Sequence, residues 1–465
     1  MSGAKAQQAV GRPGRYGPYP EYKDSGVEWL GEIPAHWEVR RLKNLIDVPI
    51  TDGPHESPEF LPEGVPFLSV DGIQDGELVF EGCRHVSEED HAKYRRKVAP
   101  RRDDVLFGKA ASTGKIARVR VGFEFSIWSP LALIRPRLGV VGPAFLELAL
   151  KAASTQAQID VLCTHSTQNN ISMDDIPLLA LAIAPLGEQR AISAFLDRET
   201  AKIDALVAKR KRLVELLHEK RTALISHAVT KGLDPNVPMK DSGVEWLGEI
   251  PAHWETNQLR HVASIRVSTV DKTQEDGERL VQCVGTKHVF NSPGIGDGMD
   301  FEMVSATPKE LREFSLHRGD VVVTKDSVVP DNIAAVSIVE EELADVVCGY
   351  HMAIVRAHAG QLASRFMFWQ MSSRPLFHQF LSAARGVTII GLSPGEMGAA
   401  RLAVPLLREQ RTIAAFLDLE TAKIDALAAK VGEGIERLKE YRTALISAAV
   451  TGKIDVRQAS IPEAG

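Results

Sequence analysis

The phrase DSGVEWLGEIPAHWE occupies residues 24–38 and returns unchanged at residues 241–255. A longer segment repeats after each copy, since EQRAISAFLDRETAKIDALVAK at 188–209 reappears as EQRTIAAFLDLETAKIDALAAK at 409–430. Self-similarity at a fixed period is the signature of an architecture built from repeated units. The sequence therefore predicts two copies of one plan, each made of the phrase, a variable stretch and a long helical segment.

Two variable stretches, at about 41–185 and 257–405, lie between the repeated segments and resemble each other only faintly. RRDDVLFGKAASTGKIARV, which begins at Arg101, aligns with HRGDVVVTKDSVVPDNIAAV, which begins at His317. Both read as a basic turn, an Asp, a β-branched strand, a polar loop and a second strand. We expect the two stretches to form divergent domains that share one mixed α/β fold.

Length and composition indicate a soluble globular protein of two or three domains, with 465 residues, 44% of them hydrophobic and 25% charged. The net charge of −6 means that any surface for nucleic acid has to be local. The longest apolar run, residues 176–186, is too short to cross a bilayer, and the start of the chain lacks a signal-peptide core, which favours a cytoplasmic location. The cysteines have no metal-ligand spacing and are expected to be free thiols: Cys83, Cys163, Cys283 and Cys348.

A heptad pattern runs through both repeated helices and predicts a coiled coil. The expected seam consists of two apolar rows offset by three residues, and its members are Leu196, Ile203, Leu206, Leu213, Leu217, Leu224, Leu417, Ile424, Leu427, Val431, Leu438 and Leu445. Matched lengths favour pairing of the two helices with each other in antiparallel orientation, while a four-helix or solenoid element is the alternative. Gly432 and Gly434 interrupt the second helix, so a kink or a close crossing is expected there.

The sequence contains two loops that partly resemble cofactor-binding motifs. GKAASTGKI at 108–116 resembles a phosphate-binding loop, but five residues separate its glycines and Ile116 stands where a Ser or Thr would bind magnesium. GIGDG at 294–298 lacks the third glycine spacing of a dinucleotide fingerprint. HExxH, GxSxG, paired CxxC and Asn-Pro-Pro-aromatic motifs do not occur. The sequence therefore indicates a protein without a catalytic or metal site of its own.

Basic residues cluster at 91–102, HAKYRRKVAPRR, and more follow in the loop and strand after Phe107. Such density suits contacts with DNA phosphates, although a solvated helix face is the ordinary explanation for a charge run. The DNA-binding candidates of the first domain are Lys93, Arg95, Arg96, Lys97, Arg101, Arg102, Lys109, Ser112, Thr113, Lys115 and Arg118. The comparable stretch of the second domain is sparser and contributes Arg312, His317, Arg318 and Lys325.

A polar loop, THSTQNN at 164–170, carries amide side chains that can pair with the donor and acceptor edge of adenine. The loop leads into Ser172, which begins a capping-box pattern, so a simple polar turn is an equally good interpretation. In the second domain the corresponding loop leads into Ser393 and contains apolar Ile389 and Ile390. The candidates from the two loops are Thr167, Gln168, Asn169, Asn170, Arg385 and Thr388. If both loops contact DNA, the two domains read different bases.

The chain resembles the DNA-specificity subunits of type I restriction-modification systems. This resemblance rests on DSGVEWLGEIPAHWE, on the pair EQRAISAFLDRETAKIDAL and EQRTIAAFLDLETAKIDAL, and on the endings RTALISHAVTKGLD and RTALISAAVTGKID, all in family order around two variable domains. It implies a mixed α/β fold in which two globular target-recognition domains are joined by two long conserved helices that form an antiparallel coiled coil, with a pseudo-twofold internal repeat.

The resemblance also implies the domain boundaries. They are a tail at 1–20, a first conserved segment at 21–40, target-recognition domain 1 at 41–185, the central helix and linker at 186–240, the repeated conserved segment at 241–256, target-recognition domain 2 at 257–405, the C-terminal helix at 406–455 and a tail at 456–465. In the family, the first segment packs near the C-terminal helix. Because the conserved segments are repeated and the target-recognition domains diverge, the preferred DNA sequence can change without altering the surface that binds partner subunits.

The function implied by the resemblance is non-catalytic. Each target-recognition domain would bind one half of a split site on double-stranded DNA, and the helices would set the spacer. The helices would also dock two modification subunits, which carry S-adenosylmethionine and methylate adenine, and the assembly would recruit restriction subunits that translocate and cut DNA with ATP and Mg. No cofactor is expected on this chain itself.

The sequence departs from the family pattern at two places. Asp103 precedes Asp104, where the second copy has Gly319 before Asp320, and SVVPDN replaces the Gly-containing loop in the second domain. Two other functions stay open from the sequence: a coiled-coil scaffold that binds proteins, and a part of a self-contained DNA-modifying enzyme.

Overall fold

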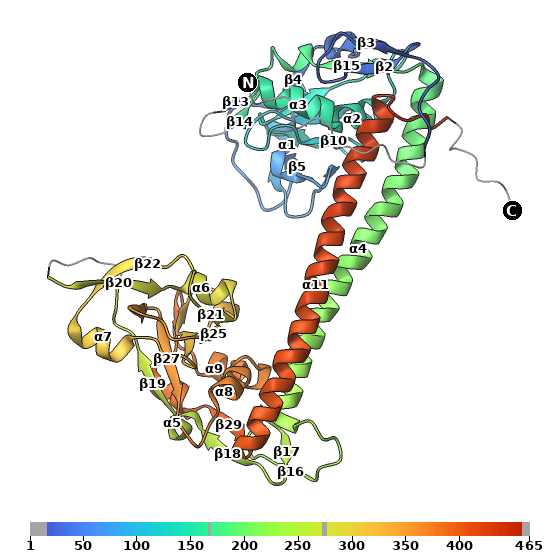
Figure 1. Cartoon of the computed structure of the whole chain (residues 1–465). Coiled ribbons are helices and arrows are strands. Elements are labelled where there is room, and N and C mark those ends of the chain that lie inside the picture. Colours follow the sequence, from blue (N-terminus) through green and yellow to red (C-terminus); the bar gives the residue numbers. More distant parts are fainter. Residues whose placement is uncertain (1–15, 166–168, 272–276, 458–465) are drawn as a thin grey trace. The chain divides into compact units, whose positions relative to one another are not determined.

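The structure, a computed structural model, describes residues 16–165, 169–271 and 277–457. The chain forms two compact units (Figure 1). The first unit contains Met1–Arg210 and Glu433–Gly465, and the second contains Lys211–Gly432. Each unit therefore combines one variable domain with the beginning of one long helix and the end of the other.

The first unit is built on a four-stranded sheet with the strand order β10-β9-β12-β4. Its strands are β4 (Thr51–Asp52), β9 (Val105–Gly108), β10 (Ile116–Arg118) and β12 (Leu131–Ile134), and each pair of neighbours is antiparallel. A second sheet has the order β11-β5-β8, with β5 (Val65–Leu68), β8 (Arg84–Val86) and β11 (Ser126–Ile127). Residues 105–108 and 131–134 are buried throughout, as expected for continuous apolar runs in the middle of a sheet.

Short ladders and helices complete the first unit. The ladders pair β1 (Tyr22–Asp24) with β2 (Glu32–Pro34), β3 (Glu38–Arg41) with β15 (Ala180–Ile183), β6 (Ile73–Gln74) with β7 (Glu77–Leu78), and β13 (Thr164–His165) with β14 (Asn169–Asn170). The helices are α1 (Glu88–Arg95), α2 (Pro143–Lys151) and α3 (Ala153–Leu162). The apolar run that follows Ser172 forms a 3-10 turn, Ile176–Leu178, and then β15.

The second unit repeats this plan. Its main sheet has the order β19-β27-β23-β25-β21, and the smaller sheet has the order β22-β20-β26. The strands are β19 (Ala263–Val267), β20 (Arg279–Val284), β21 (Gly294–Ile295), β22 (Glu302–Ala306), β23 (Val321–Thr324), β25 (Val336–Val339), β26 (Val346–Cys348) and β27 (Met352–Ala357). The ladders pair β16 (Met239–Asp241) with β17 (Glu249–Pro251), β18 (Glu255–Gln258) with β29 (Arg401–Val404), and β24 (Asp326–Ser327) with β28 (Ile390–Gly391).

The short helices of the second unit are α5 (Leu259–Val262), α6 (Thr286–Asn291), α7 (Pro308–Phe314), α8 (Ser364–Met371), α9 (Arg374–Ala383) and α10 (Pro394–Ala399). The Ser393 hydroxyl accepts a hydrogen bond from the Glu396 backbone N–H, and the Ser393 backbone N–H donates to the Glu396 carboxylate. This capping box starts α10 as the sequence predicts. At the equivalent place in the first unit, Ser172 caps a turn instead of an α-helix.

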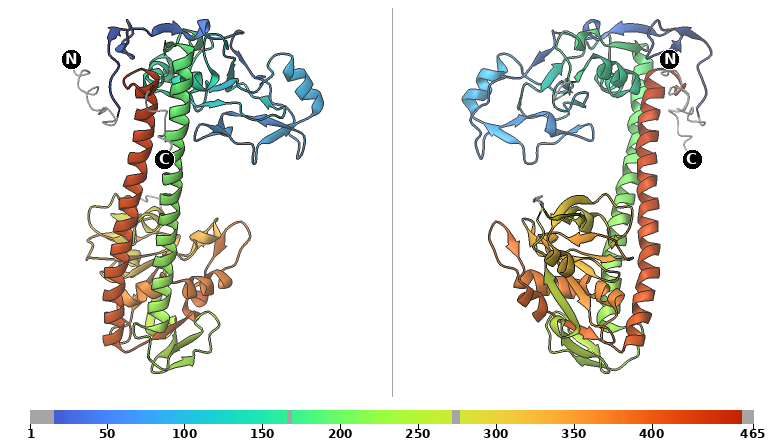
Figure 2. Two further views of the ribbon diagram at one scale, coloured as in Figure 1. Left: turned by 90° about the vertical axis from the view of Figure 1, so that its right-hand side faces the viewer. Right: turned by 60° about the vertical axis from the view of Figure 1, so that its left-hand side comes forward.

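The two long helices, α4 (Leu186–Lys231) and α11 (Leu407–Val450), are continuous over 46 and 44 residues and run side by side (Figures 1 and 2). In the first unit Arg442 Nε donates to Asp204 Oδ1 at 2.9 Å, and in the second Arg221 Nε donates to Asp425 Oδ1 at 2.9 Å. The beginning of each helix therefore lies beside the end of the other. The predicted fold class, with two α/β domains and an antiparallel pair of long helices, is confirmed.

The helix seam differs from the expected one in its second row. Leu206, Leu213 and Leu427 are 41%, 42% and 48% exposed, so the prediction that they lie in the seam is wrong. The buried row follows the first by four residues, through Thr421, Ile435 and Ala449 in α11. Both rows contain apolar residues, and the direction from which the partner helix approaches selects between them. Of the other expected members, Leu196, Ile203, Leu217, Leu417, Ile424 and Leu445 are buried, and Leu224, Val431 and Leu438 are half-buried.

The glycines of α11 do not interrupt the helix. A Cβ atom on Gly434 would lie 2.4 Å from Arg210 Nη1, whereas one on Gly432 would meet nothing within 4 Å. The close crossing that the sequence predicts therefore occurs at Gly434, and a kink is absent from this described part of the chain.

The first copy of the repeated phrase packs on the end of α11. Trp37 is fully buried, and the Tyr22 hydroxyl donates to the Gly452 carbonyl at 3.0 Å. The Lys453 ammonium donates to the carbonyl of Glu32. A segment near the start of the chain is thus fixed to the end of the last helix, in agreement with the packing implied by the resemblance.

The second copy of the phrase packs in the same way on the end of α4. Trp254 is fully buried, and the Lys231 ammonium donates to the carbonyl of Glu249. Each phrase is therefore bound to the helix of the other copy. We call each place where a phrase packs on the end of a long helix a joint. The equivalent packing explains why the phrase has the same sequence in both joints.

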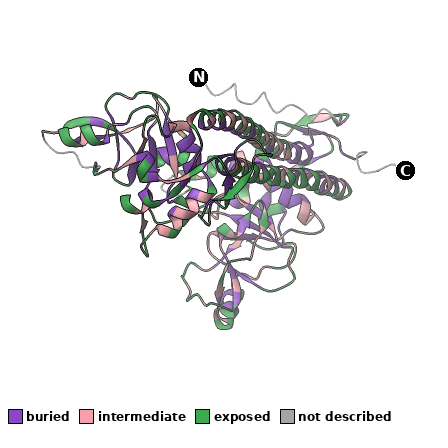
Figure 3. Ribbon diagram, turned by 90° about the horizontal axis from the view of Figure 1, so that it is seen from below, coloured by how far each residue is buried: buried purple, intermediate pink, exposed green. Residues whose placement is uncertain are grey.

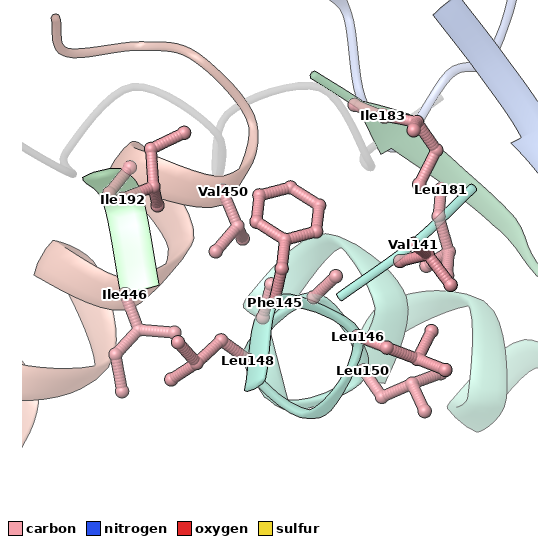
Figure 4. Packing of buried hydrophobic residues seen from close by; sticks show 14 of the residues in the cluster. Val141, Phe145, Leu146, Leu148, Leu150, Leu181, Ile183, Ile192, Ile446 and Val450 are labelled. Carbon is pink, nitrogen blue, oxygen red and sulfur yellow. The ribbon is translucent and has the colours of Figure 1, made fainter. Parts of the chain in front are cut away.

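A hydrophobic core fills each joint. In Figure 4, Phe145 and Leu148 of α2 lie against Ile446 and Val450 of α11, and Ile192 of α4 lies on the same side. Figure 3 shows buried residues gathered in the sheets and on the inner sides of the helices, while large parts of the long helices are exposed. The four cysteines are free, and among the described residues no helix is long and apolar enough to cross a membrane.

An ion pair holds the aligned motif of each domain. In the first unit, Arg135 Nε and Nη2 donate to Asp104 Oδ1 and Oδ2 at 2.8 and 2.7 Å, and the Arg101 backbone N–H donates to Asp104 Oδ2. In the second unit, Arg356 pairs with Asp320 at 2.6 and 2.7 Å. The aspartate shared by the two motifs therefore ties the turn before one strand to the end of the neighbouring strand.

Candidate nucleic-acid interface

The basic run of the first domain forms α1 and the turn that follows it. Ser87 caps the helix, because its hydroxyl accepts a backbone N–H of the first turn. Lys93 binds Glu56 at 2.6 Å, and Arg95 forms an ion pair with Glu124. Part of the positive charge is therefore neutralised within the chain. The other predicted residues of the run, Arg96, Lys97, Arg101 and Arg102, are exposed.

Strand β9 separates the predicted residues into two groups. Arg101 and Arg102 precede the strand, and Arg118 lies at the same end, because it pairs with Val105. Lys109 follows the strand and lies at the opposite end. The sequence brought all of these residues into one stretch, but the structure does not bring them into one site.

Arg118 belongs to a buried ion-pair network. Its guanidinium donates to Asp103 at 2.8 Å and to Glu147 at 3.2 Å, and Lys151 donates to Glu147 at 2.6 Å. Burial alone would raise the pKa of Glu147, but Lys151, Arg120 and Arg118 outweigh it, and the pKa lies below its usual value. The contacts of Arg118 are therefore those of a structural residue.

A mixed charge cluster lies at the end of β9. Lys109 Nζ and Lys97 Nζ lie 3.0 and 2.6 Å from the two carboxylate oxygens of Asp52, and His55 Nε2 lies 3.0 Å from Asp52 Oδ2. His55 Nδ1 lies 3.1 Å from the Ser129 hydroxyl. We call Asp52, His55, Lys97, Lys109 and Ser129 the first centre. It presents an exposed imidazole above a half-buried lysine.

The two lysines control the charge of Asp52. Burial alone would raise the pKa of this carboxyl, but hydrogen bonds from Lys97 and Lys109 outweigh it, so the pKa lies below its usual value. The carboxylate therefore stays ionised at neutral pH. Because both oxygens of the Asp52 carboxylate bind cationic side chains, the carboxylate orients Lys97 and Lys109. Its negative charge is compensated by theirs and does not by itself repel a DNA phosphate.

The second unit contains a corresponding cluster at the end of β23. Lys325 pairs with Asp326, and His351 Nδ1 lies 3.3 Å from Asp326 Oδ2. Lys325 Nζ lies 4.9 Å from the centre of the Tyr350 ring, which is half exposed. We call Lys325, Asp326, Tyr350 and His351 the second centre. Both units thus gather a lysine, an aspartate and an exposed histidine at the end of equivalent strands, although the aspartates and the histidines come from different positions of the fold.

In the first unit, the predicted polar loop lies beside the first centre. Asn169 and Asn170 form β14, Asn170 bridges to Ala110, and the Thr113 hydroxyl donates to the Asn169 carbonyl at 2.8 Å. The backbone N–H of Ile171 donates to the Lys109 carbonyl. Two loops far apart in the sequence are therefore joined. Ser112, Thr113 and Lys115 are half-buried, while Thr167 and Gln168 lie outside the described residues.

In the second unit the corresponding loop takes the same position. Strand β28 pairs with β24, and the Leu392 backbone N–H donates to the Lys325 carbonyl at 2.8 Å. Arg385 and Thr388 on this loop are exposed, and Val387 and Ile389 are exposed apolar residues. The loop therefore offers apolar and cationic groups where the first unit offers amides.

Three further candidates of the second domain lie away from Lys325. His317 and Arg318 precede β23, and their partner is Glu342, which lies 3.3 Å from His317 Nδ1 and accepts from the Arg318 backbone N–H at 3.2 Å. Arg312 lies on α7 and is exposed. The structure does not place these three residues in the second centre.

Sequence reasoning missed the members of the centres other than the lysines: Asp52, His55, Ser129, Asp326, Tyr350 and His351. An isolated aspartate argues against phosphate binding, and a scattered histidine carries little signal. One sequence feature could have indicated the sites, because both lysines occupy the first position after the aligned β-branched strand.

A second candidate surface lies on the outer side of the long helices. In the first unit it consists of the exposed residues Ala201, Lys202, Ala205, Leu206 and Lys209, and in the second of the exposed residues Ala422, Lys423, Ala426, Leu427 and Lys430. The residues are identical in the two copies and share one helix face. We call each set a helix patch. Each unit therefore presents one helix patch of the same composition.

Comparison with known proteins agrees with this architecture. No family model matches the chain. The EcoKI specificity subunit of Escherichia coli is 20% identical over 447 residues, which cover 91% of this chain and 90% of the relative. A Methanocaldococcus jannaschii protein, provisionally named the MjaX type I restriction enzyme specificity subunit, is 23% identical over 445 residues, which cover 92% of this chain and 96% of the relative.

Solved structures show the same fold. A chain from a type I restriction-modification system has a TM-score of 0.65 at 14% identity, and the match covers 90% of this chain and 98% of the solved one. The HsdS subunit of Thermoanaerobacter tengcongensis has a TM-score of 0.50 at 16% identity, with 91% and 98% covered. The fold and its duplicated joints define a two-domain subunit carried on paired helices. The resemblance to DNA-specificity subunits of type I restriction-modification systems is confirmed.

Proposed function

We propose that this chain is the non-catalytic subunit that selects DNA for a type I restriction-modification complex, and that each unit reads one half of a bipartite target. The duplicated plan carries this proposal. Two domains of one fold are attached to nearly identical phrases and helices, yet the side chains of their candidate contact loops differ in chemistry. Such a chain recognises two different half-sites on double-stranded DNA and keeps one kind of partner surface.

The proposed contacts with DNA are of two kinds, those with the phosphate backbone and those with the base edges. The exposed arginines after α1 are suited to phosphates, which fix position without sequence information. The first and second centres, together with the adjoining loops, supply hydrogen-bond donors and acceptors for base edges. Half-site preference therefore depends on His55, Asn169 and Asn170 in the first unit and on His351 and Tyr350 in the second.

The helix patches dock the modification subunits, one on each unit. Leucine and alanine side chains between lysines form a small apolar surface with a charged border, a composition that suits a protein partner. S-adenosylmethionine binds the modification subunits, and ATP and Mg act on the restriction subunits. The chain itself needs no cofactor for this role and works in the cytoplasm, where the DNA is. The long helices hold the two variable domains and set the number of unread base pairs between the half-sites.

A coiled-coil protein scaffold and a fragment of a DNA-modifying enzyme are less well supported, since the relatives in both comparisons are type I specificity subunits.

The deciding experiment is long-read sequencing of methylated adenines in the native genome before and after deletion of the gene. Loss of one bipartite motif on deletion, and its return when the gene is supplied again, is the expected result. A deletion strain with every methylated motif intact, in cells whose modification subunits are expressed and active, contradicts the proposal.

A further inference from the structure

Glu188 and Glu409 occupy equivalent positions at the beginning of the two long helices, in EQR motifs of the same repeat. In the first unit, Glu188 accepts hydrogen bonds from the Tyr19 hydroxyl and from His36 Nε2, the latter at 2.9 Å. Its side chain is 7% exposed, whereas that of Glu409 is 33% exposed. The two joints therefore differ in how completely this carboxylate is covered.

A tyrosine-containing segment covers Glu188. Tyr19 is 2% exposed, its ring centre lies 5.8 Å from that of Trp37, and the Arg457 guanidinium lies 4.9 Å from it on another side. Tyr16 packs edge-on against Phe195 at 5.0 Å. The segment YGPYP, residues 16–20, is thus held in a pocket by two aromatic anchors and one buried carboxylate.

The Tyr19 hydroxyl donates to Glu188, whereas a tryptophan N–H donates to the equivalent glutamate in the other joint. In the second unit, Trp254 Nε1 donates to Glu409 Oε1 at 3.0 Å, and His253 Nε2 lies 3.0 Å from Glu409 Oε2. In the first unit the buried N–H of Trp37 has no hydrogen-bond partner among the described residues. Tyrosine therefore displaces the tryptophan from the shared glutamate, and the joint tolerates that exchange.

The second unit has no tyrosine at this place. Asn236 aligns with Tyr19 and lies in an exposed turn, whose N–H donates to Asp234 Oδ1 at 2.9 Å. A cavity of about 340 Å³ opens beside the turn, larger than the cavities of about 150 Å³ that bind a benzene ring. Its lining consists of Leu233, Asp234, Leu406, Arg408, Glu409, Thr412 and Ile413. Leu406 is 76% exposed, so an apolar wall faces solvent.

Chain connectivity explains the difference. In the first unit two stretches of chain meet at the joint, since the Asp455 backbone N–H donates to the Gly17 carbonyl at 2.8 Å and Val456 is fully buried. In the second unit a single stretch passes directly from α4 to β16. The single stretch of the second unit leaves open the space beside Glu409, whereas the two stretches of the first unit fill the equivalent space beside Glu188.

We propose that the cavity of the second unit binds a tyrosine-containing, proline-flanked segment of a partner protein in the way that the first unit binds its own residues 16–20. The tyrosine ring lies against Leu406 and Ile413, its hydroxyl donates to Glu409, and Arg408 takes the place that Arg457 has over Tyr19. This proposal does not depend on DNA recognition, and it names a second protein contact besides the helix patches.

The test uses the full chain and a fluorescein-labelled peptide with the sequence of residues 14–23, GRYGPYPEYK, measured by fluorescence anisotropy. Because the first unit is filled by its own segment, one saturable site is expected. A peptide with alanine in place of the tyrosine equivalent to Tyr19 is expected to bind at least roughly tenfold more weakly. Thr412→Arg, which fills the cavity from an exposed helix position, is expected to remove binding.

Leu419→Arg is the matched control, because Leu419 is an exposed apolar residue of the same helix outside the cavity. It is expected to bind the peptide like the wild type. The double variant Tyr16→Ala, Tyr19→Ala removes both aromatic anchors of the first pocket and is expected to raise the stoichiometry from one peptide to two. Binding that survives Thr412→Arg in the chain with Tyr19 intact, or the absence of saturable binding, overturns the proposal. So does self-association of the chain that Thr412→Arg abolishes, since the occupant is then a second copy.

Discussion

Arg135 and Asp104 form a two-point ion pair in the first unit, from Nε to Oδ1 at 2.8 Å and from Nη2 to Oδ2 at 2.7 Å. Arg356 and Asp320 repeat it in the second unit. The variable domains resemble each other only faintly, yet this pair is retained in both. It belongs to the part of the fold that the two variable domains share.

Asp104→Ala is expected to destabilise the first unit by about 3–5 kcal/mol, because it leaves the Arg135 guanidinium without its buried partner. Urea unfolding followed by circular dichroism measures the change. Asp103→Asn is the matched control: it keeps a residue that tolerates the positive φ of 73° and removes one exposed contact of Arg118, so a loss under about 1 kcal/mol is expected. Equal losses for the two variants would show that the ion pair has no special role.

Glu147 gives the first unit a pH dependence. Its pKa is lowered in the folded state, so it stabilises the fold above the unfolded value of about 4.3, and this contribution is lost as the pH falls through the folded pKa. Glu147→Gln is expected to cost about 1.5–3 kcal/mol at pH 7. The difference from the wild type is expected to stay constant down to about pH 5 and to shrink below about pH 4. Unfolding curves at several pH values, with exposed Glu81→Gln as control, measure it; a difference that grows at low pH contradicts the sign.

The two centres predict separable effects on the DNA target. His55→Ala is expected to relax one position of one half-site by about 1–3 kcal/mol, and His351→Ala one position of the other half-site. Both histidines are exposed, and exposed ion pairs contribute only about 0–1 kcal/mol, so folding does not account for the change.

Sequencing of methylated adenines in cells that carry each variant reports both half-sites together. His218→Ala, at an exposed histidine of α4, is the control and is expected to leave both half-sites unchanged. If the wild type methylates a bipartite motif and both variants methylate the same motif, the centres do not read bases, while the proposed function stands.

The helix patches predict a stoichiometry. Leu206→Asp is expected to remove one modification subunit from the complex, Leu427→Asp the other, and the double variant both, because a charge in the centre of a small apolar contact costs about 2 kcal/mol or more. Mass photometry of the reconstituted complex counts the subunits. Leu216→Asp, at a leucine of similar exposure that the second copy does not repeat, is expected to retain two. Two subunits on the double variant would locate the docking surface elsewhere.

One glycine inside the last helix and one just after it predict opposite effects of one substitution. Gly432→Ala is expected to stabilise by about 0.5–1 kcal/mol, since the site is helical and a Cβ there meets nothing within 4 Å. Gly452→Ala is expected to destabilise by at least about 1–2 kcal/mol, because its φ is 72° and a Cβ would lie 2.3 Å from Pro34 Cδ. Thermal unfolding separates them; a stable Gly452→Ala variant would mean that the turn adapts.

Repeats and periodicity were sufficient to predict the fold class. The repeated segments fixed the two-copy plan, and the heptads fixed the long helices. They could not select between the rows that contain Leu206 and Val207, since both are apolar and the approach of the partner helix decides.

The candidate site was harder to predict, because its members are far apart in the chain. Lys109 was identified from local basic density, but Asp52 and Ser129 reach it through sheet pairing of β4, β9 and β12. Arg118 shows the same effect: it lies near Lys109 in the sequence, while antiparallel pairing puts it at the other end of the strand beside buried Glu147.

The composition of the first unit affects the order of folding during synthesis. Its core includes Ile446, Ile454 and Val456, which are synthesised after the second unit, whereas the second unit is one uninterrupted stretch, Lys211–Gly432. Domains generally fold from the N-terminus as they emerge from the ribosome, at about 5–20 residues per second. Here the part of the chain made first waits tens of seconds for its last helix. We therefore expect the first unit to complete its core only after the second unit has been synthesised.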